Sequence, residues 1–273
     1  MFGLMKPSLT IFLVQFARLT AADSTFNYEI SARVKEEVQS FLSESSTAAT
    51  LPLYMLQSGV VNATDFYASQ FLPGSRLFFN LVQLYNNQIT LFKFCFPNKI
   101  YFSLAQAPAS PNGIILNANT MSNLKVNNVF YVKPNGLPSG LANCSLSPTT
   151  LCPFSYDCTT RGWYKQGSTT PYKQWIAPFL QSVPAVPAIS INIPFIRNGK
   201  FVVLICTNIE LQLINNYLVN TYSSTNRNIF IVDAPTGLLI ANSLNASLTT
   251  PNGKVSNYRI FPLLELNFNY FSS

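Results

Sequence analysis

The chain of 273 residues is 48% hydrophobic and 14% aromatic, and only 10% of its residues are charged, against roughly 25% in an average globular protein. This composition excludes a disordered chain and allows one large or two modest domains with a substantial core. The net charge of +7 reflects scarce acids, and the 17 Lys and Arg residues are scattered, which argues against a nucleic-acid surface. The complete absence of His excludes Ser-His-Asp and Cys-His catalysis and removes the commonest metal ligand.

Residues 1–22 have the layout of a secretory signal peptide. Lys6 precedes an apolar stretch over residues 9–17, and the small residues Thr20, Ala21 and Ala22 follow it, as at a cleavage site. The stretch is shorter than the roughly 20 residues that cross a bilayer, so an uncleaved anchor is the second interpretation and a buried helix the third. Export is also favoured by three N-glycosylation sequons, which start at Asn62, Asn143 and Asn245.

A long amphipathic helix is predicted over residues 24–45, directly after the signal segment. Its apolar residues recur at helical spacing, while charged residues occupy the other face. The apolar positions are Phe26, Ile30, Val34, Val38 and Phe41. Residues 47–72 show no single secondary-structure pattern, because Pro52 interrupts them. Within them, residues 62–71 are compatible with a short helix.

Strand-like patterns begin at Arg76. Residues 76–85 and 89–96 are predicted to form a β-hairpin, and further strands follow at 100–105, 113–116 and 129–133. Segments rich in Pro and Asn separate these strands, which predicts an antiparallel sheet.

The C-terminal half predicts two more hairpins around a helix. Strands 188–196 and 201–207 flank Asn198-Gly199, a strong signal for a tight hairpin turn. A helix over 208–222 is predicted to be capped by Asn208. The second hairpin is expected from strands 227–233 and 238–242.

The five cysteines divide by sequence context. Cys95 and Cys206 lie in apolar strands and are interpreted as buried thiols. Three others lie in a loop-rich stretch where one disulfide is expected in an oxidising compartment, with zinc as the weaker alternative. These three are Cys144, Cys152 and Cys158.

Residues 156–179 are the most distinctive stretch, and both tryptophans lie in it. Arg161, Trp163 and Tyr164 combine a guanidinium, an indole N–H and a phenol, a set that can hold a carboxylate. The competing interpretation is an Arg that stacks on aromatic rings at the edge of a core. Nucleophile elbows, phosphate loops and metal-ligand spacings are absent from the sequence, so neither an enzyme, a metal site nor a cofactor is predicted.

A spaced series of residues runs through this region: Tyr156, Arg161, Trp163, Tyr164, Trp175, Pro178, Phe179, Pro194, the Asn198-Gly199 turn and the Thr207–Leu211 step before a helix. In this order they resemble the double Cache (dCache) extracellular sensor domain. Such domains occur in ciliate membrane proteins, bacterial chemoreceptors, sensor kinases and calcium-channel α2δ subunits. The resemblance covers roughly residues 24–242 in layout.

The resemblance implies an α+β fold. A long helix (23–47) would precede a membrane-distal PAS-like ligand-binding module (48–224) and the beginning of a smaller membrane-proximal module (225–273). On this layout the chain ends before the second module is complete, so a fragment of a longer receptor or a truncated secreted form is expected. Membrane attachment would come from a segment outside this chain, and a homodimer through the N-terminal helix is a further expectation.

In amino-acid-binding members of the family, residues of this motif contact the ligand, with Arg and Trp on its carboxylate. Four positions match here, while Phe179 replaces a Tyr and Asn208 replaces the Asp that holds the amine. Loss of that carboxylate weakens an ammonium's binding roughly ten- to a hundredfold. The resemblance implies an extracellular or secreted sensory domain for a small carboxylate, amino acids included; the alternative is an interaction ectodomain with a degenerate site. The four matching residues are Tyr156, Arg161, Trp163 and Tyr164.

Overall fold

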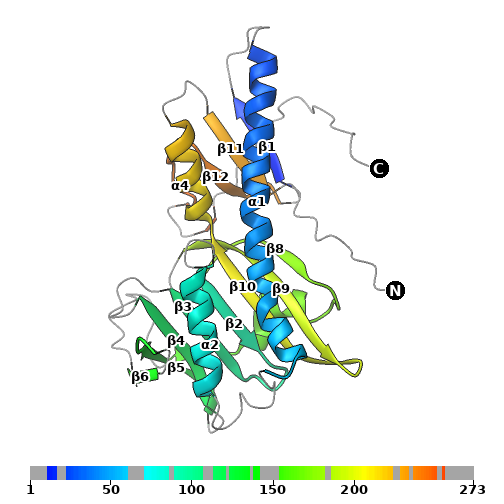
Figure 1. Cartoon of the computed structure of the whole chain (residues 1–273), viewed down its shortest axis with the longest axis vertical. Coiled ribbons are helices and arrows are strands. Elements are labelled where there is room, and N and C mark those ends of the chain that lie inside the picture. The colour runs from blue at the N-terminus through cyan, green and yellow to red at the C-terminus, as the bar shows by residue number, and fades with distance from the viewer. Residues whose placement is uncertain are drawn as a thin grey trace.

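The computed structural model describes residues 11–16, 23–60, 71–85, 89–106, 113–120, 123–135, 138–141, 154–181, 186–223, 228–233, 236–250 and 254–255. A long helix runs beside two antiparallel sheets, a large one and a small one (Figure 1). The prediction of an α+β fold with a long N-terminal helix, a large antiparallel sheet and a second, smaller sheet unit is confirmed. Several predicted features lie outside the described residues, namely the short helix over 62–71 apart from its last residue, Asn62, Asn143, Cys144 and Cys152.

Helix α1 comprises Asp23–Gln57 and contains the predicted amphipathic face. Val34 and Val38 are buried against the sheet, as the helical spacing predicts. The helix is longer than predicted, because Pro52 lies inside it without ending it. Pro52 is itself buried, and Leu56 packs into the core beyond it, so tertiary contacts hold the last turn in place despite the hydrogen bond that proline removes.

Helix α2 comprises Phe71–Leu84, so the predicted strand over 76–85 and its hairpin are wrong. Phe78, Leu81 and Val82 are buried at the i, i+3, i+4 spacing of a helix, whereas Asn80 and Gln83 are exposed. The continuous apolar run around Phe78 obscures this spacing, because such a run fits either a buried strand or a buried helix.

The large sheet has nine strands in the order β6-β5-β4-β3-β2-β10-β9-β8, with β7 also paired to β5. Every pairing in it is antiparallel, as predicted. After β7 the chain returns to the other side of β2, where β10 pairs with β2, β9 with β10 and β8 with β9. The strands are β2 (Leu91–Cys95), β3 (Tyr101–Gln106), β4 (Ile114–Thr120), β5 (Asn123–Val132), β6 (Pro138–Leu141), β7 (Phe154–Ser155), β8 (Gln174–Leu180), β9 (Pro187–Arg197) and β10 (Lys200–Glu210).

One face of this sheet forms the main core. Helix α2 packs on β2 and β3, and α1 packs on β9 and β10 (Figure 1). Phe78 from α2 lies among Phe92, Phe94 and Phe102, with ring centroids 4.7 to 6.5 Å away. The predicted turn between β9 and β10 is confirmed, since Asn198 and Gly199 have φ of 53° and 71°, as a tight hairpin requires.

The small sheet consists of β1 (Ile11–Phe16), β11 (Asn228–Asp233) and β12 (Leu239–Asn242), and α4 (Leu211–Tyr222) packs against it. The β11–β12 hairpin is therefore confirmed. Strand β1 lies within the predicted signal segment and pairs antiparallel with β11, so the interpretation of this stretch as a buried helix is wrong. Among the residues described, no helix is both long enough and apolar enough to cross a bilayer.

Candidate functional site

The second face of the large sheet carries a row of polar side chains. Lys93 lies opposite Ser103 on one side and Cys206 on the other, and Cys206 lies opposite Asn192. Directly paired residues of an antiparallel sheet point to the same face. This row of Ser103, Lys93, Cys206 and Asn192, together with Asn208 two residues beyond Cys206, is called the polar face below.

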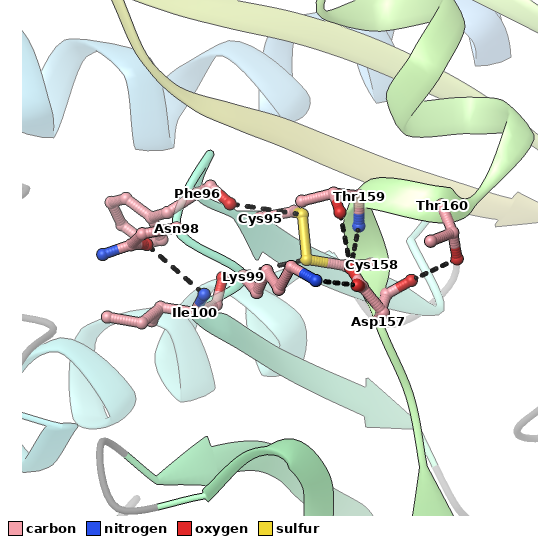
Figure 2. A network of polar contacts seen from close by, with 9 residues as sticks. All are labelled: Cys95, Phe96, Asn98, Lys99, Ile100, Asp157, Cys158, Thr159 and Thr160. Carbon is pink, nitrogen blue, oxygen red and sulfur yellow. Dashed lines mark hydrogen bonds and ion pairs between the residues drawn. A yellow bond between two sulfur atoms is a disulfide. The ribbon is translucent and has the colours of Figure 1, made fainter.

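The Arg-x-Trp-Tyr motif lies over the polar face on two short helical turns, η3 (Cys158–Thr160) and α3 (Gly162–Gly167). A disulfide between Cys158 and Cys95 of β2 fixes the start of this segment (Figure 2). The interpretation of Cys95 as a free thiol is wrong, whereas Cys206 is free and buried. The pairing of Cys95 with Cys158 was not predicted from the sequence, because the two residues are 63 positions apart and no local pattern links them.

Asp157 adds a second fixed point beside the disulfide. Its carboxylate accepts a hydrogen bond from the Thr159 backbone N–H at 3.0 Å and forms an ion pair with Lys99 at 2.8 Å (Figure 2). Burial alone would raise the pKa of Asp157, but the bonds from Lys99 and Thr159 outweigh it and lower that pKa. Asp157 thus acts as the N-cap of the short helical turn η3.

The other end of α3 is held to β9 and β10. The Asn192 side-chain amide donates to the Trp163 carbonyl oxygen at 2.6 Å. Gly167 allows this close approach, since a Cβ there would lie 2.6 Å from Asn192 Nδ2 and 2.7 Å from Leu204 Cδ2. The motif is thus fixed at both ends against the sheet.

Arg161 is exposed and stacks on Tyr156, with its guanidinium carbon 4.5 Å from the ring centroid. Tyr156 in turn contacts Tyr101 of β3 at 4.8 Å between ring centroids. Burial raises the pKa of Tyr156, and a hydrogen bond with Trp163 opposes that rise. The aromatic stack predicted as the competing interpretation is therefore present, and it leaves the guanidinium open to solvent.

Tyr164 does not belong to the stack of Arg161 on Tyr156. It is 8% exposed and packs edge-on against Phe201 in an apolar cluster with Leu204 and the disulfide. This position places Tyr164 with the packing that supports the motif.

Lys93 was not identified by sequence. Its side chain is only 4% exposed, and its Nζ lies 4.3 Å from the Trp163 ring centroid and 5.4 Å from that of Phe179. Burial lowers the pKa of Lys93, while the neighbouring Cys206 thiol opposes that shift. The available signal was a single charged residue inside the apolar run of β2, with Phe on either side.

Asn208 is fully buried at the end of β10, and its side-chain amide donates to Gln181 Oε1. The Cys206 thiol donates to Asn208 Oδ1 at 3.6 Å. The prediction that Asn208 caps the following helix is wrong, because Glu210 occupies that position and Asn208 remains in the strand. Its position on the polar face brings it to the same side of the sheet as Lys93.

The structure therefore brings Tyr156, Arg161 and Trp163 together, and Lys93 connects Trp163 to Phe179. Within the described ranges, no group of three or more His, Cys, Asp or Glu residues could hold a metal ion. The groups gathered here are cations, amides and aromatic rings, which are suited to binding an anion with an apolar or planar part.

No family model matches the sequence, and no curated protein matches it. The structure is similar to sensory domains of bacterial chemoreceptors. The sensory domain of Tlp3 from Campylobacter jejuni, solved with isoleucine, matches with a TM-score of 0.45 at 12% identity over 82% of this chain and 76% of that chain. The ligand-binding domain of PctC from Pseudomonas aeruginosa, solved with GABA, matches with a TM-score of 0.43 at 12% identity over 81% of this chain and 76% of that chain. The ligand-binding domain of CtaA from Pseudomonas fluorescens, solved with L-alanine, matches with a TM-score of 0.45 at 14% identity over 80% of this chain and 70% of that chain.

Proposed function

We propose that the chain is an extracellular sensory domain that binds a small carboxylate-bearing metabolite over the polar face and passes the signal to a membrane receptor. The observation that carries this proposal is the placement of Arg161 and Trp163. The exposed guanidinium and the indole lie on one short segment that is fixed by a disulfide, an ion pair and the Asn192 hydrogen bond. Donors held in place in this way can bind a carboxylate with little loss of side-chain entropy.

A location outside the cytoplasm is supported by the Cys95–Cys158 disulfide, because such bonds persist in oxidising compartments. Asn245, the one predicted glycosylation site within the described residues, is exposed in a turn with φ of 55°. An attached glycan would project from this turn without disturbing the core. Both features suit an exported domain.

Helix α1 is the element that would transmit binding. It packs on β9 and β10 of the large sheet and also contacts β1 of the small sheet (Figure 1). Lys173, between α3 and β8, donates a hydrogen bond from Nζ to Ser46 Oγ of α1 at 2.8 Å. A ligand that shifts the segment from α3 to β8 would therefore displace α1 relative to the small sheet.

Thermal unfolding of the full chain with a panel of small carboxylates and amino acids tests the proposal. A ligand at a hundred times its dissociation constant stabilises the protein by about 2.7 kcal/mol. Arg161→Ala is expected to abolish this effect, because it removes the charged donors from the motif. Arg197→Ala, at the exposed tip of the β9–β10 hairpin, is the matched control and leaves ligand stabilisation intact.

A chain that responds to no carboxylate, or an Arg161→Ala variant with unchanged affinity, would contradict this function. The first outcome would instead support an interaction ectodomain in which Arg161 serves only to stack on Tyr156.

A further inference from the structure

Lys93 is the charged group of the polar face that the proposed Arg161–Trp163 site does not use. An ion pair joins Lys99 to Asp157, whereas Lys93 has no carboxylate partner among the residues described. The groups around the Lys93 ammonium are the Trp163 and Phe179 rings and the Cys206 thiol. A buried ammonium that has lost its hydration without gaining a carboxylate partner favours the approach of an anion.

Among the described residues around Lys93, none carries a carboxylate that could neutralise a ligand's ammonium group. Asn208 is uncharged, and its side-chain amide donates a hydrogen bond to Gln181 Oε1. Glu210 is the acid that follows on β10. It lies about 13 Å along the strand from Cys206, the residue opposite Lys93, and about 7 Å from Asn208, and burial raises its pKa. A ligand ammonium beside Lys93 would therefore meet its positive charge, whereas Glu210 lies far along the strand from Lys93 and burial disfavours its charged form.

Starting from the proposed function, we infer that the ligand is a small carboxylate without an ammonium group, and that Lys93 binds its anionic or polar end across the site from Arg161. Dicarboxylates satisfy both cations, so they are favoured over monocarboxylates. Free amino acids are disfavoured because their ammonium group would lie close to Lys93.

Three four-carbon acids provide a matched set of probes for calorimetric titration of the full chain. Succinate, butyrate and 4-aminobutyrate share one carboxylate and differ at the other end, which is anionic, apolar or cationic. The expected order of affinity is succinate, then butyrate, then 4-aminobutyrate, with at least about a tenfold difference between first and last. L-alanine and propionate form a second pair, in which propionate is expected to bind more tightly.

Lys93→Met retains the length of the side chain and removes its charge. It is expected to lower succinate affinity about tenfold or more and to leave butyrate affinity nearly unchanged. Lys200→Met, at the exposed start of β10, removes one positive charge at a distance and serves as the control. Asn208→Asp, which adds a carboxylate to the polar face, is expected to weaken succinate and strengthen 4-aminobutyrate, and it provides a second test if Lys93→Met does not fold.

Each outcome separates this inference from the function on which it rests. If 4-aminobutyrate or alanine binds as tightly as its partner acid, the chain is a carboxylate sensor but the assignment of Lys93 is overturned. An unchanged succinate affinity in Lys93→Met likewise overturns it. If no carboxylate binds at all, the proposed function fails, and the inference about Lys93 fails with it.

Discussion

The two faces of the large sheet differ although the same strands build both. On β2, Phe92 and Phe94 are fully buried in the aromatic core beneath α2, and Lys93 between them points to the polar face. The first face is mainly apolar, so burial of its side chains stabilises the fold. The second carries a buried cation and buried amides, groups that cost stability unless a partner compensates them. Under the proposed function, stability and binding therefore depend on opposite sides of one strand.

Phe94→Ala gives the largest expected effect on the apolar face. The ring is fully buried, 4.7 Å from Phe78 and 5.8 Å from Phe102 between centroids. Its removal leaves a cavity and is expected to cost about 3–5 kcal/mol of unfolding free energy, measured by denaturant titration. Ligand affinity of the folded protein is expected to stay within about twofold.

The adjacent residue provides the matched comparison. Lys93→Met is expected to leave the unfolding free energy unchanged or to raise it, because it replaces a buried cation by an apolar side chain of similar length. If instead it destabilises the chain as much as Phe94→Ala does, the division between the two faces is wrong.

Loss of the Cys95–Cys158 disulfide is expected to have the next largest effect, on the polar face. Closing a loop across 63 residues corresponds to about 4 kcal/mol in the chain-entropy model. Reduction is therefore expected to lower the midpoint of thermal unfolding and also to weaken carboxylate binding, since η3 and Arg161 lose their covalent attachment to β2. The variant with both Cys95→Ala and Cys158→Ala serves as the control and is expected to be insensitive to reductant, whereas equal responses of both proteins would contradict the structural role of this bond.

Sequence patterns predicted the apolar face better than the polar one. The spacing of Val34 and Val38 gave α1, and Asn198-Gly199 gave the β9–β10 hairpin, because both signals are local. Helix α2 was mistaken for a strand because its apolar residues are contiguous around Phe78. Burial there is decided by tertiary packing, which a continuous apolar run does not specify.

The sequence pattern itself predicted the candidate site only where its residues are close in sequence, and Phe179 and Asn208 came from the family resemblance. Arg161 and Trp163 are two positions apart and were found together. Lys93 and Cys95 come from a strand more than 60 residues earlier, and only the sheet register and the 63-residue disulfide bring that strand beneath the motif. A single Lys in a strand gives no local signal that distinguishes a solvent-facing residue from a buried one.

Gly167→Ala tests how closely α3 must approach the polar face, and it is expected to be the mildest of the three destabilising changes. An added Cβ would lie within 3.0 Å of Asn192 Nδ2 and both Leu204 methyl groups. The overlap is expected to cost about 1–3 kcal/mol and to weaken the Asn192 bond to the Trp163 carbonyl. Because that bond positions the indole over Lys93, carboxylate affinity is expected to fall by more than the stability loss alone would cause.

Gly162→Ala, at the other end of α3, is the matched control, since a Cβ there meets no atom within 4 Å. It is expected to leave both stability and affinity nearly unchanged. If Gly167→Ala lowers stability but leaves affinity as in Gly162→Ala, α3 does not need close contact with β9 to hold Trp163 in place. Lys93 and Arg161 would then act independently of the packing of α3, and binding would depend on the charges of the polar face alone.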